Sequence, residues 1–146
     1  GITTLEDKSC GCVQKGGTAP IMDVIGYGDP VVTKGLNMLY GPGNDLVSAT
    51  AMTAAGAHLI LFSTGRGTPF SAPAPTQKIT TNTPQAKNTS HNKHFNTGGI
   101  ADGEKTIDEA ARDLLDLVIR VAGGEQTKAE KHGFREISIF KDGVVL

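Results

Sequence analysis

The feature that most constrains the fold is a regular alternation of short apolar runs with segments rich in glycine and proline. The run His-Leu-Ile-Leu-Phe at 58–62 is continuous, which is typical of a parallel strand covered on both faces. Segments with helical periodicity separate this run from other strand-like segments. We therefore expect an α/β domain with a mostly parallel sheet flanked by helices, in a three-layer, Rossmann-like arrangement.

Further segments have the pattern of strands. Residues 20–25 and 36–40 are short apolar stretches that end at glycine, and residues 77–81 alternate polar and apolar side chains. Near the end of the chain, residues 137–140 and 144–146 flank Lys-Asp-Gly. This pattern predicts a C-terminal β-hairpin.

The clearest helical pattern lies in residues 106–122, where Thr106 and Glu109 fit a capping box and a pair of glycines follows the last turn. The polar segment before it, 82–99, predicts a loop with a short helix near Pro84. The apolar residues of the long helix recur at helical spacing and predict its buried face: Ile107, Ala111, Leu114, Val118 and Val121.

A helix is also predicted over residues 4–14, because Thr3 and Glu6 fit a capping box. This helix carries the two cysteines of the chain, Cys10 and Cys12, which lie one residue apart. Thiols at this spacing point in different directions on a helix, and a disulfide across so short a loop is strained. We therefore expect free thiols, buried or incidental, rather than a disulfide or a metal site.

The composition excludes several classes of function. A chain of 146 residues with 38% hydrophobic and 20% charged residues is typical of one globular domain. Its formal net charge is −1, so neither nucleic acid nor an anionic membrane is an expected partner. The sequence contains no apolar run long enough to cross a bilayer and no signal-peptide pattern, so we expect a cytoplasmic protein.

Two glycine-rich segments directly follow predicted strands. Residues 41–45 follow one strand and residues 63–68 follow the next. In sheets of parallel strands, ligands bind beyond the carboxyl ends of the strands. We therefore expect both segments to open onto the same sheet edge and to form a binding site there.

The segment Ser-Thr-Gly-Arg-Gly-Thr at 63–68 is the first candidate for ligand binding. Gly65 and Gly67 allow the backbone to come close to a ligand, and the guanidinium of Arg66 suits a carboxylate or phosphate. The segment matches neither a P-loop nor a dinucleotide-binding fingerprint. The alternative interpretation is a surface loop whose arginine binds neighbouring carbonyls.

The segment Gly-Pro-Gly-Asn-Asp at 41–45 is the second candidate. It begins a predicted helix that ends at Ala55, and either Asn44 or Asp45 caps that helix. A purely structural cap is one interpretation. The alternative is that Asp45 orients a base or a metal-bound water.

Longer stretches of the sequence resemble the altronate/galactarate dehydratase family, and they follow one another over nearly the whole chain. The altronate branch resembles the chain more closely than the galactarate branch does, in Val-Gln-Lys-Gly-Gly and Gly-Pro-Gly-Asn-Asp. Cys10 and residues 91–94 depart from the family pattern. The matching stretches are Gly-Ile-Thr-Thr-Leu-Glu-Asp-Lys-Ser and Gly-Cys-Val-Gln-Lys-Gly-Gly near the start, then residues 41–48, 61–69, 78–82, 101–104 and 135–144.

The resemblance implies that residues 1–146 are a single domain, the C-terminal part of a longer sugar-acid dehydratase. Such an enzyme converts an aldonic acid to a 2-keto-3-deoxy acid with a divalent metal, and we expect iron(II) held mainly outside this chain. The expected partners are the sugar acid, the preceding domains and further copies in a homo-oligomer. We expect the chain alone to be inactive.

The resemblance also implies roles for individual residues. We expect Asp45 and Lys78 to be catalytic, and we assign no metal ligand in this chain. We expect substrate binding by Arg66, Thr64, Gly65, Gly67 and Asn44. Two alternatives stay open: a sulfolactate sulfo-lyase of the same family, and a noncatalytic sugar-acid-binding or assembly domain.

Overall fold

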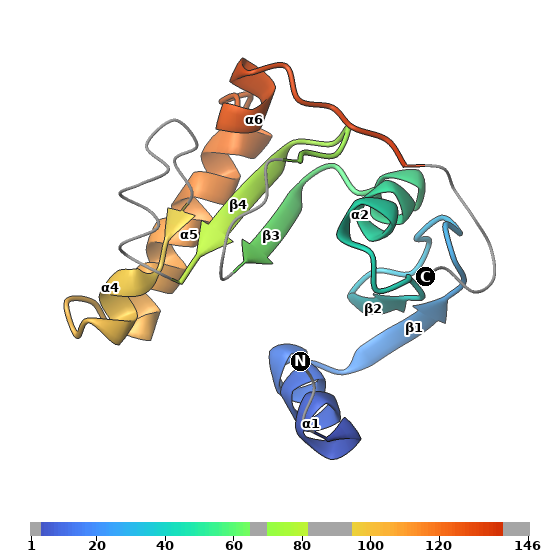
Figure 1. Ribbon diagram of the computed structural model, residues 1–146, viewed down its shortest axis with the longest axis horizontal. Helices are drawn as coiled ribbons and strands as arrows, with labels where there is room; N and C mark the ends of the chain where they lie inside the picture. The colour runs from blue at the N-terminus through green and yellow to red at the C-terminus, as the bar shows by residue number, and fades with distance from the viewer. Residues whose placement is uncertain (1–3, 65–69, 82–94, 139–146) are drawn as a thin grey trace.

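The computed structural model describes residues 4–64, 70–81 and 95–138 (Figure 1). Its α/β class and the parallel pairing of its strands confirm the prediction, but the described strands form two separate sheets rather than one. The first sheet pairs β1 (Ile21–Ile25) with β2 (Leu36–Leu39). The second has the order β3-β4-β5 and consists of β3 (Ile60–Thr64), β4 (Thr76–Thr80) and β5 (Phe95–Asn96).

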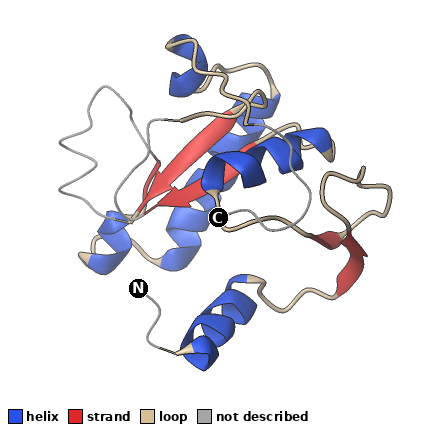
Figure 2. Ribbon diagram, turned by 45° about the vertical axis from the view of Figure 1, so that its right-hand side comes forward, coloured by secondary structure: helices blue, strands red, loops and turns tan. Residues whose placement is uncertain are grey.

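Helices lie on both faces of the β3-β4-β5 sheet, as Figures 1 and 2 show. Ala49 of α2 packs with Ile60 of β3 on one face. On the other face, side chains of α5 and α6 line a pocket with Gln77 of β4. The described helices are α1 (Leu5–Lys15), α2 (Asp45–Ala54), α4 (Gly98–Ala101), α5 (Ile107–Ala122) and α6 (Lys128–Lys131).

The buried core lies between α2 and this sheet, and small residues dominate it. Ala49, Ile60, Ala72 and Ala74 form the cluster, each less than 10% exposed. Alanine at these positions allows the helix to approach the sheet closely, and Phe62 with Phe70 completes the packing nearby. Their rings meet edge to face, with centroids 5.1 Å apart.

Two of the three predicted helix starts are confirmed, and one is displaced by a residue. Thr106 and Glu109 form the capping box of α5, and Asn44 caps α2. The cap of α1 is Thr4 rather than Thr3, because the Thr4 side chain accepts a hydrogen bond from the backbone N–H of Asp7. Consecutive threonines, each with an acidic residue three positions later, made the two caps indistinguishable in the sequence.

The prediction of which strand is covered on both faces was wrong. β3 is an edge strand, and its Leu61 remains 46% exposed. β4 is the central strand, and four of its residues are buried. Central position, rather than hydrophobicity, therefore decides the burial of these strands: polar Lys78 in β4 is 6% exposed.

The predicted buried face of α5 was also partly wrong. Ile107 is 71% exposed and Ala111 is exposed, whereas Ala110 and Val121 are buried. Leu114, Leu117 and Val118 are half-buried, so the buried stripe follows positions 110, 114, 117, 118 and 121. The residues of this stripe also recur at helical spacing, and packing against the sheet determines which side of the helix is buried.

The segment after α6 returns across the molecule toward α2, as Figure 1 shows. The backbone N–H of Ser138 donates to the Thr50 hydroxyl of α2 at 3.1 Å. Ile137 and Ser138 are not in a strand. The remainder of the predicted hairpin, 139–146, lies outside the described residues, as do residues 82–94 of the predicted loop with its short helix. Residues 95–99 of that loop instead contain β5 and the start of α4. In the described ranges, no helix is long and apolar enough to cross a membrane.

Candidate functional site

The carboxyl ends of β3 and β4 bring two of the predicted site residues onto one face of the sheet. Phe62 pairs with Lys78, and Thr64 pairs with Thr80. Because side chains two residues apart share a face of a strand, Thr64, Lys78 and Thr80 lie on the same face. Ligands commonly bind beyond the carboxyl ends of parallel strands, and the sequence continues from β3 into residues 65–69.

Lys78 is the chemically distinctive residue of this face. It is 6% exposed, and burial lowers its pKa because a low-dielectric surrounding disfavours the charged ammonium. The negative charge of Glu136 partly offsets this effect and raises the pKa. A lysine with a lowered pKa exchanges its proton more readily, so it suits general acid or base chemistry. Structural burial of a lysine produces the same shift, so this property makes Lys78 a candidate.

The C-terminal segment supplies the carboxylate that influences Lys78. The Oε2 atom of Glu136 accepts a hydrogen bond from the backbone N–H of Ser71 at 2.8 Å. The backbone N–H of Glu136 in turn donates to the carbonyl of Ser71 at 2.7 Å. Glu136 was missed in the sequence, although it lies in a stretch that resembles the family, because nothing local to residue 136 indicates a partner 65 positions away.

Asn44 and Asp45 lie at the start of α2, the helix that packs on the Lys78 face of the β3-β4-β5 sheet. Asn44 uses its side-chain oxygen to accept hydrogen bonds from the backbone N–H groups of Leu46 and Val47, at 3.1 and 3.2 Å. Asp45 is exposed in the first turn of α2. Among the described residues, β2 and β3 belong to different sheets, so the prediction that the segments after these two strands leave one sheet was wrong. Gly65, Arg66 and Gly67 lie outside the described residues.

The described residues do not form a metal site of their own. Within residues 4–64, 70–81 and 95–138, no group of three His, Cys, Asp or Glu side chains is placed to hold a metal ion. Cys10 and Cys12 are free thiols, as predicted, and both are exposed on α1 rather than buried. The described residues therefore do not fit a resident metal, and we derive no catalytic step through one.

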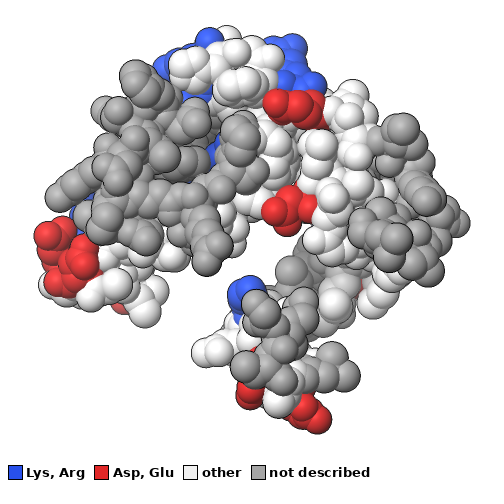
Figure 3. Space-filling model, viewed as in Figure 1, with Lys and Arg blue, Asp and Glu red and all other residues white. Residues whose placement is uncertain are grey.

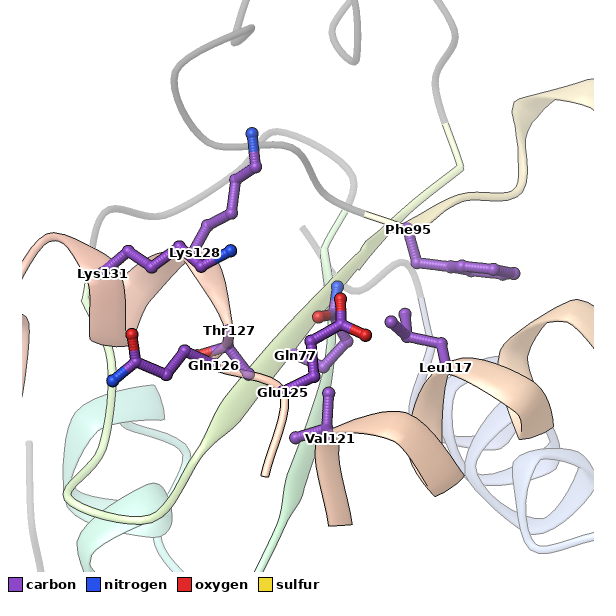
Figure 4. Close-up of a pocket in the computed structure, with 9 residues that line it drawn as sticks. All are labelled: Gln77, Phe95, Leu117, Val121, Glu125, Gln126, Thr127, Lys128 and Lys131. Atoms are coloured by element: carbon purple, nitrogen blue, oxygen red, sulfur yellow. The ribbon is translucent and has the colours of Figure 1, made fainter. Parts of the chain in front are cut away.

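A separate pocket of about 230 Å³ lies on the opposite side of β4 from Lys78, between α5 and α6 (Figure 4). Gln77 lies at its base and is 8% exposed. Its side-chain N–H donates to the carbonyl of Lys78 at 3.0 Å. Leu117, Val121 and Phe95 supply apolar walls, and the lysines of α6 lie at one end of the pocket. Of the predicted site residues that the structure describes, none lines this pocket.

Charged side chains of both signs are distributed over the surface shown in Figure 3. Acidic side chains gather near α4, and basic side chains gather near α6. This distribution accords with 14 basic and 15 acidic residues in the whole chain. On the described part of this face, no stripe of one sign follows the sheet or the helices.

Comparisons with known proteins give consistent matches over the whole chain. Residues 1–145 match the family described as D-galactarate/altronate dehydratase, C-terminal. The altronate dehydratases of Escherichia coli (strain K12) and Bacillus subtilis (strain 168) are 47% and 46% identical to the chain over 146 residues. The galactarate dehydratase (L-threo-forming) of Escherichia coli (strain K12) is 31% identical over 99% of the chain. The chain spans 29% of the length of each altronate dehydratase and 28% of that of the galactarate dehydratase.

Proposed function

Because the chain belongs to the D-galactarate/altronate dehydratase family, as its C-terminal part, we propose that it is the C-terminal domain of a hydro-lyase acting on altronate. The observation that carries the proposal is the higher identity to two altronate dehydratases than to the galactarate dehydratase, over nearly the same residues. The chain spans less than a third of these relatives. We therefore propose that the preceding domains supply the remainder of the active site.

The reaction is the loss of water from an aldonic acid. A base removes the proton from the carbon beside the carboxylate, and the electron pair of that C–H bond forms a carbon–carbon double bond. The hydroxyl of the next carbon leaves as water after taking a proton from an acid. The resulting enol gains a proton on carbon and becomes a 2-keto-3-deoxy acid. Such a reaction needs a base, an acid and fixed positive charge near the carboxylate.

Lys78 is the described residue best suited to one of these roles. Its buried ammonium lies on the Thr64 face of the sheet, and its lowered pKa favours proton transfer. We propose that Lys78 gives or takes the proton and that the Thr64 hydroxyl contacts a substrate hydroxyl. A buried cation also stabilises negative charge that develops on the substrate, because water screens it less than at a surface.

The loop after β3 binds the carboxylate in this proposal. The Arg66 guanidinium holds both carboxylate oxygens, and Gly65 and Gly67 allow the backbone to approach them. From α2, Asn44 offers its side-chain NH₂, because its oxygen is engaged in capping, and Asp45 acts as a base or orients one. Asn44 and Asp45 begin the helix that packs on the Lys78 face of the β3-β4-β5 sheet, and we propose that the preceding domains complete the site around them.

A divalent metal, iron(II), also belongs to the proposal. Such an ion would supply positive charge near the substrate carboxylate. Since the described residues do not form a metal site, we propose that the preceding domains hold it. We further propose a cytoplasmic location, which the free thiols of Cys10 and Cys12 support.

Assays of the full-length protein and of the present chain test this function. With iron(II) present, we expect the full-length protein to dehydrate altronate faster than galactarate and to leave sulfolactate unchanged, and we expect the present chain alone to show no turnover. In the full-length protein, Lys78→Met should abolish turnover, whereas Lys105→Met should retain it, because Lys105 is an exposed lysine paired with Asp113. Full activity of Lys78→Met would remove the catalytic role, and a preference for another acid would correct the substrate.

A further inference from the structure

One face of the β1-β2 sheet is apolar and open. Ile21 pairs with Leu36, and Val24 pairs with Met38. Because Leu36 and Met38 are two residues apart, these pairs lie on the same face. Their exposed fractions are 54% for Ile21, 38% for Leu36, 73% for Val24 and 53% for Met38. We call these four residues the β1-β2 apolar face.

The other face of the same sheet has polar contacts within the domain. The carboxylate of Asp23 accepts a hydrogen bond from the Thr33 hydroxyl at 2.9 Å. The side-chain amide of Asn37 donates to the Thr33 carbonyl at 2.7 Å. The two faces therefore differ: Asp23 and Asn37 make hydrogen bonds inside the domain on one face, and the apolar face remains without a cover among the described residues.

A sheet of this kind is not expected to be stable in water with an open apolar face. Parallel strands occur almost exclusively in sheets that are covered on both faces. Two strands alone are marginally stable, and here both strands are edges within the described sheet. A contiguous apolar patch on an otherwise polar surface indicates an interaction site.

The apolar surface continues onto α1. A pocket of about 280 Å³ lies between the end of α1 and the sheet, and Ile21, Leu36 and Met38 line one side of it. Cys12 and Val13 line the opposite side, and Val13 is 77% exposed. None of the described residues that line the pocket is charged. A lining without charge is typical of permanent interfaces, which resemble a domain core cut in two.

We propose that the β1-β2 apolar face and the pocket beside α1 are the interface with the preceding part of the full-length protein. This inference rests on the proposed function only in that the chain is the C-terminal part of a longer enzyme. The altronate dehydratases that match extend far beyond the 29% that the chain spans, and the match is to the C-terminal part of the family. Their additional length therefore lies before α1, the helix that lines this pocket.

The occupant is an apolar segment of those preceding residues. It fills the pocket against Val13 and covers Val24 and Met38. The interface lies at the N-terminal end of the domain, beside the β1-β2 sheet from which α2 begins. It therefore fixes α2, with Asn44 and Asp45, relative to the preceding domains.

Thiol chemistry tests the proposal without measuring activity. Cys12 lines the pocket, whereas Cys10 does not, so the two cysteines can be compared within one helix. In the full-length protein carrying Cys10→Ser, with any cysteine outside the present chain also replaced by serine, we expect Cys12 to react with iodoacetamide about tenfold or more slowly than in the denatured protein. Reaction at the denatured rate would overturn the proposal.

A charge placed on the face supplies the second arm of the experiment. In the same full-length protein, Val24→Lys should restore fast alkylation of Cys12, because an ammonium is costly in an apolar interface. Ile119→Lys is the matched control, since Ile119 is 60% exposed on α5, away from this face. In this variant the alkylation of Cys12 should remain slow. Equal rates for both variants would refute the interface.

The same measurement excludes a second copy as the occupant. Protection by the preceding residues is intramolecular, so the alkylation rate should not change with protein concentration. Protection that disappears on dilution would identify a second copy and overturn the proposal. If Cys12 is alkylated slowly in a full-length protein that has no dehydratase activity, the proposed interface is supported and only the proposed function is refuted.

Discussion

Ser71 and Glu136 exchange two hydrogen bonds, one in each direction. The backbone N–H of Ser71 donates to the Glu136 carboxylate, and the backbone N–H of Glu136 donates to the Ser71 carbonyl. Ser71 is fully buried, so both of its backbone groups depend on these partners. These two hydrogen bonds attach the C-terminal segment to the loop before β4. They also hold the Glu136 carboxylate where its charge raises the pKa of Lys78.

Glu136→Ala should destabilise the fold, because it leaves the buried N–H of Ser71 without an acceptor. We expect the free energy of unfolding to fall by about 1–3 kcal/mol, measured by urea denaturation of the full-length protein. Asp113→Asn is the control, since it removes an exposed ion pair with Lys105 and should cost less than about 1 kcal/mol. Equal losses in both variants would show that the Glu136 contact does not stabilise the fold.

Because of Lys78, the free energy of unfolding should increase as the pH rises. Burial lowers its folded-state pKa below the 10.5 of the unfolded chain. Between those two values the unfolded chain holds the proton and the folded chain does not, so the free energy of unfolding rises with pH. Below the folded-state pKa, the cost of burying the charge is present in full.

Comparison with Lys78→Met measures this contribution. Relative to that variant, the wild-type protein should become more stable as the pH rises toward 10.5. Relative to Lys105→Met, the wild-type protein should instead become less stable as the pH rises, because the hydrogen bond and charge of Asp113 raise the pKa of Lys105. A wild-type curve parallel to that of Lys78→Met would mean that Lys78 has the same pKa in both states.

Asn44→Ala separates the structural role of this residue from the proposed binding role. The variant loses the acceptor for two backbone N–H groups at the start of α2, and we expect a loss of about 1 kcal/mol in the free energy of unfolding. Asn44→Asp keeps the acceptor and should restore stability, but it loses the NH₂ group proposed for the substrate. A higher KM in Asn44→Asp at unchanged stability would support binding, and an unchanged KM would leave Asn44 as a cap alone.

The sequence was informative wherever local signals decide the structure. The capping box of Thr106 and Glu109, the cap at Asn44 and the strands at 20–25 and 36–40 depend on neighbouring residues, and the structure confirms them. β4 was also located correctly, and Lys78 in it was recognised as a candidate.

The features that depend on long-range pairing could not be predicted. Hydrophobicity marked β3 as the covered strand, but strand order makes it an edge and leaves Leu61 exposed. The division into two sheets is also set by pairing, so β2 and β3 do not lie in one described sheet. Glu136 reaches Ser71 only through the folded path of the C-terminal segment.

Arg66 is the residue whose substitution most directly tests the proposed substrate contact. In the sequence it lies between two glycines, shortly after Thr64, the last residue of β3. The substrate keeps its carboxylate throughout the reaction, and a guanidinium both binds that group and fixes its plane. In the full-length protein, Arg66→Lys keeps the charge but loses the two-point contact. It should therefore lower kcat/KM for altronate by more than about tenfold, equivalent to about 1.4 kcal/mol.

Arg66→Ala should lower kcat/KM further, because it removes the charge as well. We expect both variants to unfold at the temperature of the wild-type protein, since an arginine that binds substrate contributes little to the fold itself. Steady-state kinetics and thermal unfolding of the same preparations check both expectations. If Arg66→Lys has wild-type kinetics while Arg66→Ala lowers the unfolding temperature, Arg66 supports the loop. Lys78 or the NH₂ group of Asn44 would then be the candidate for binding the substrate carboxylate.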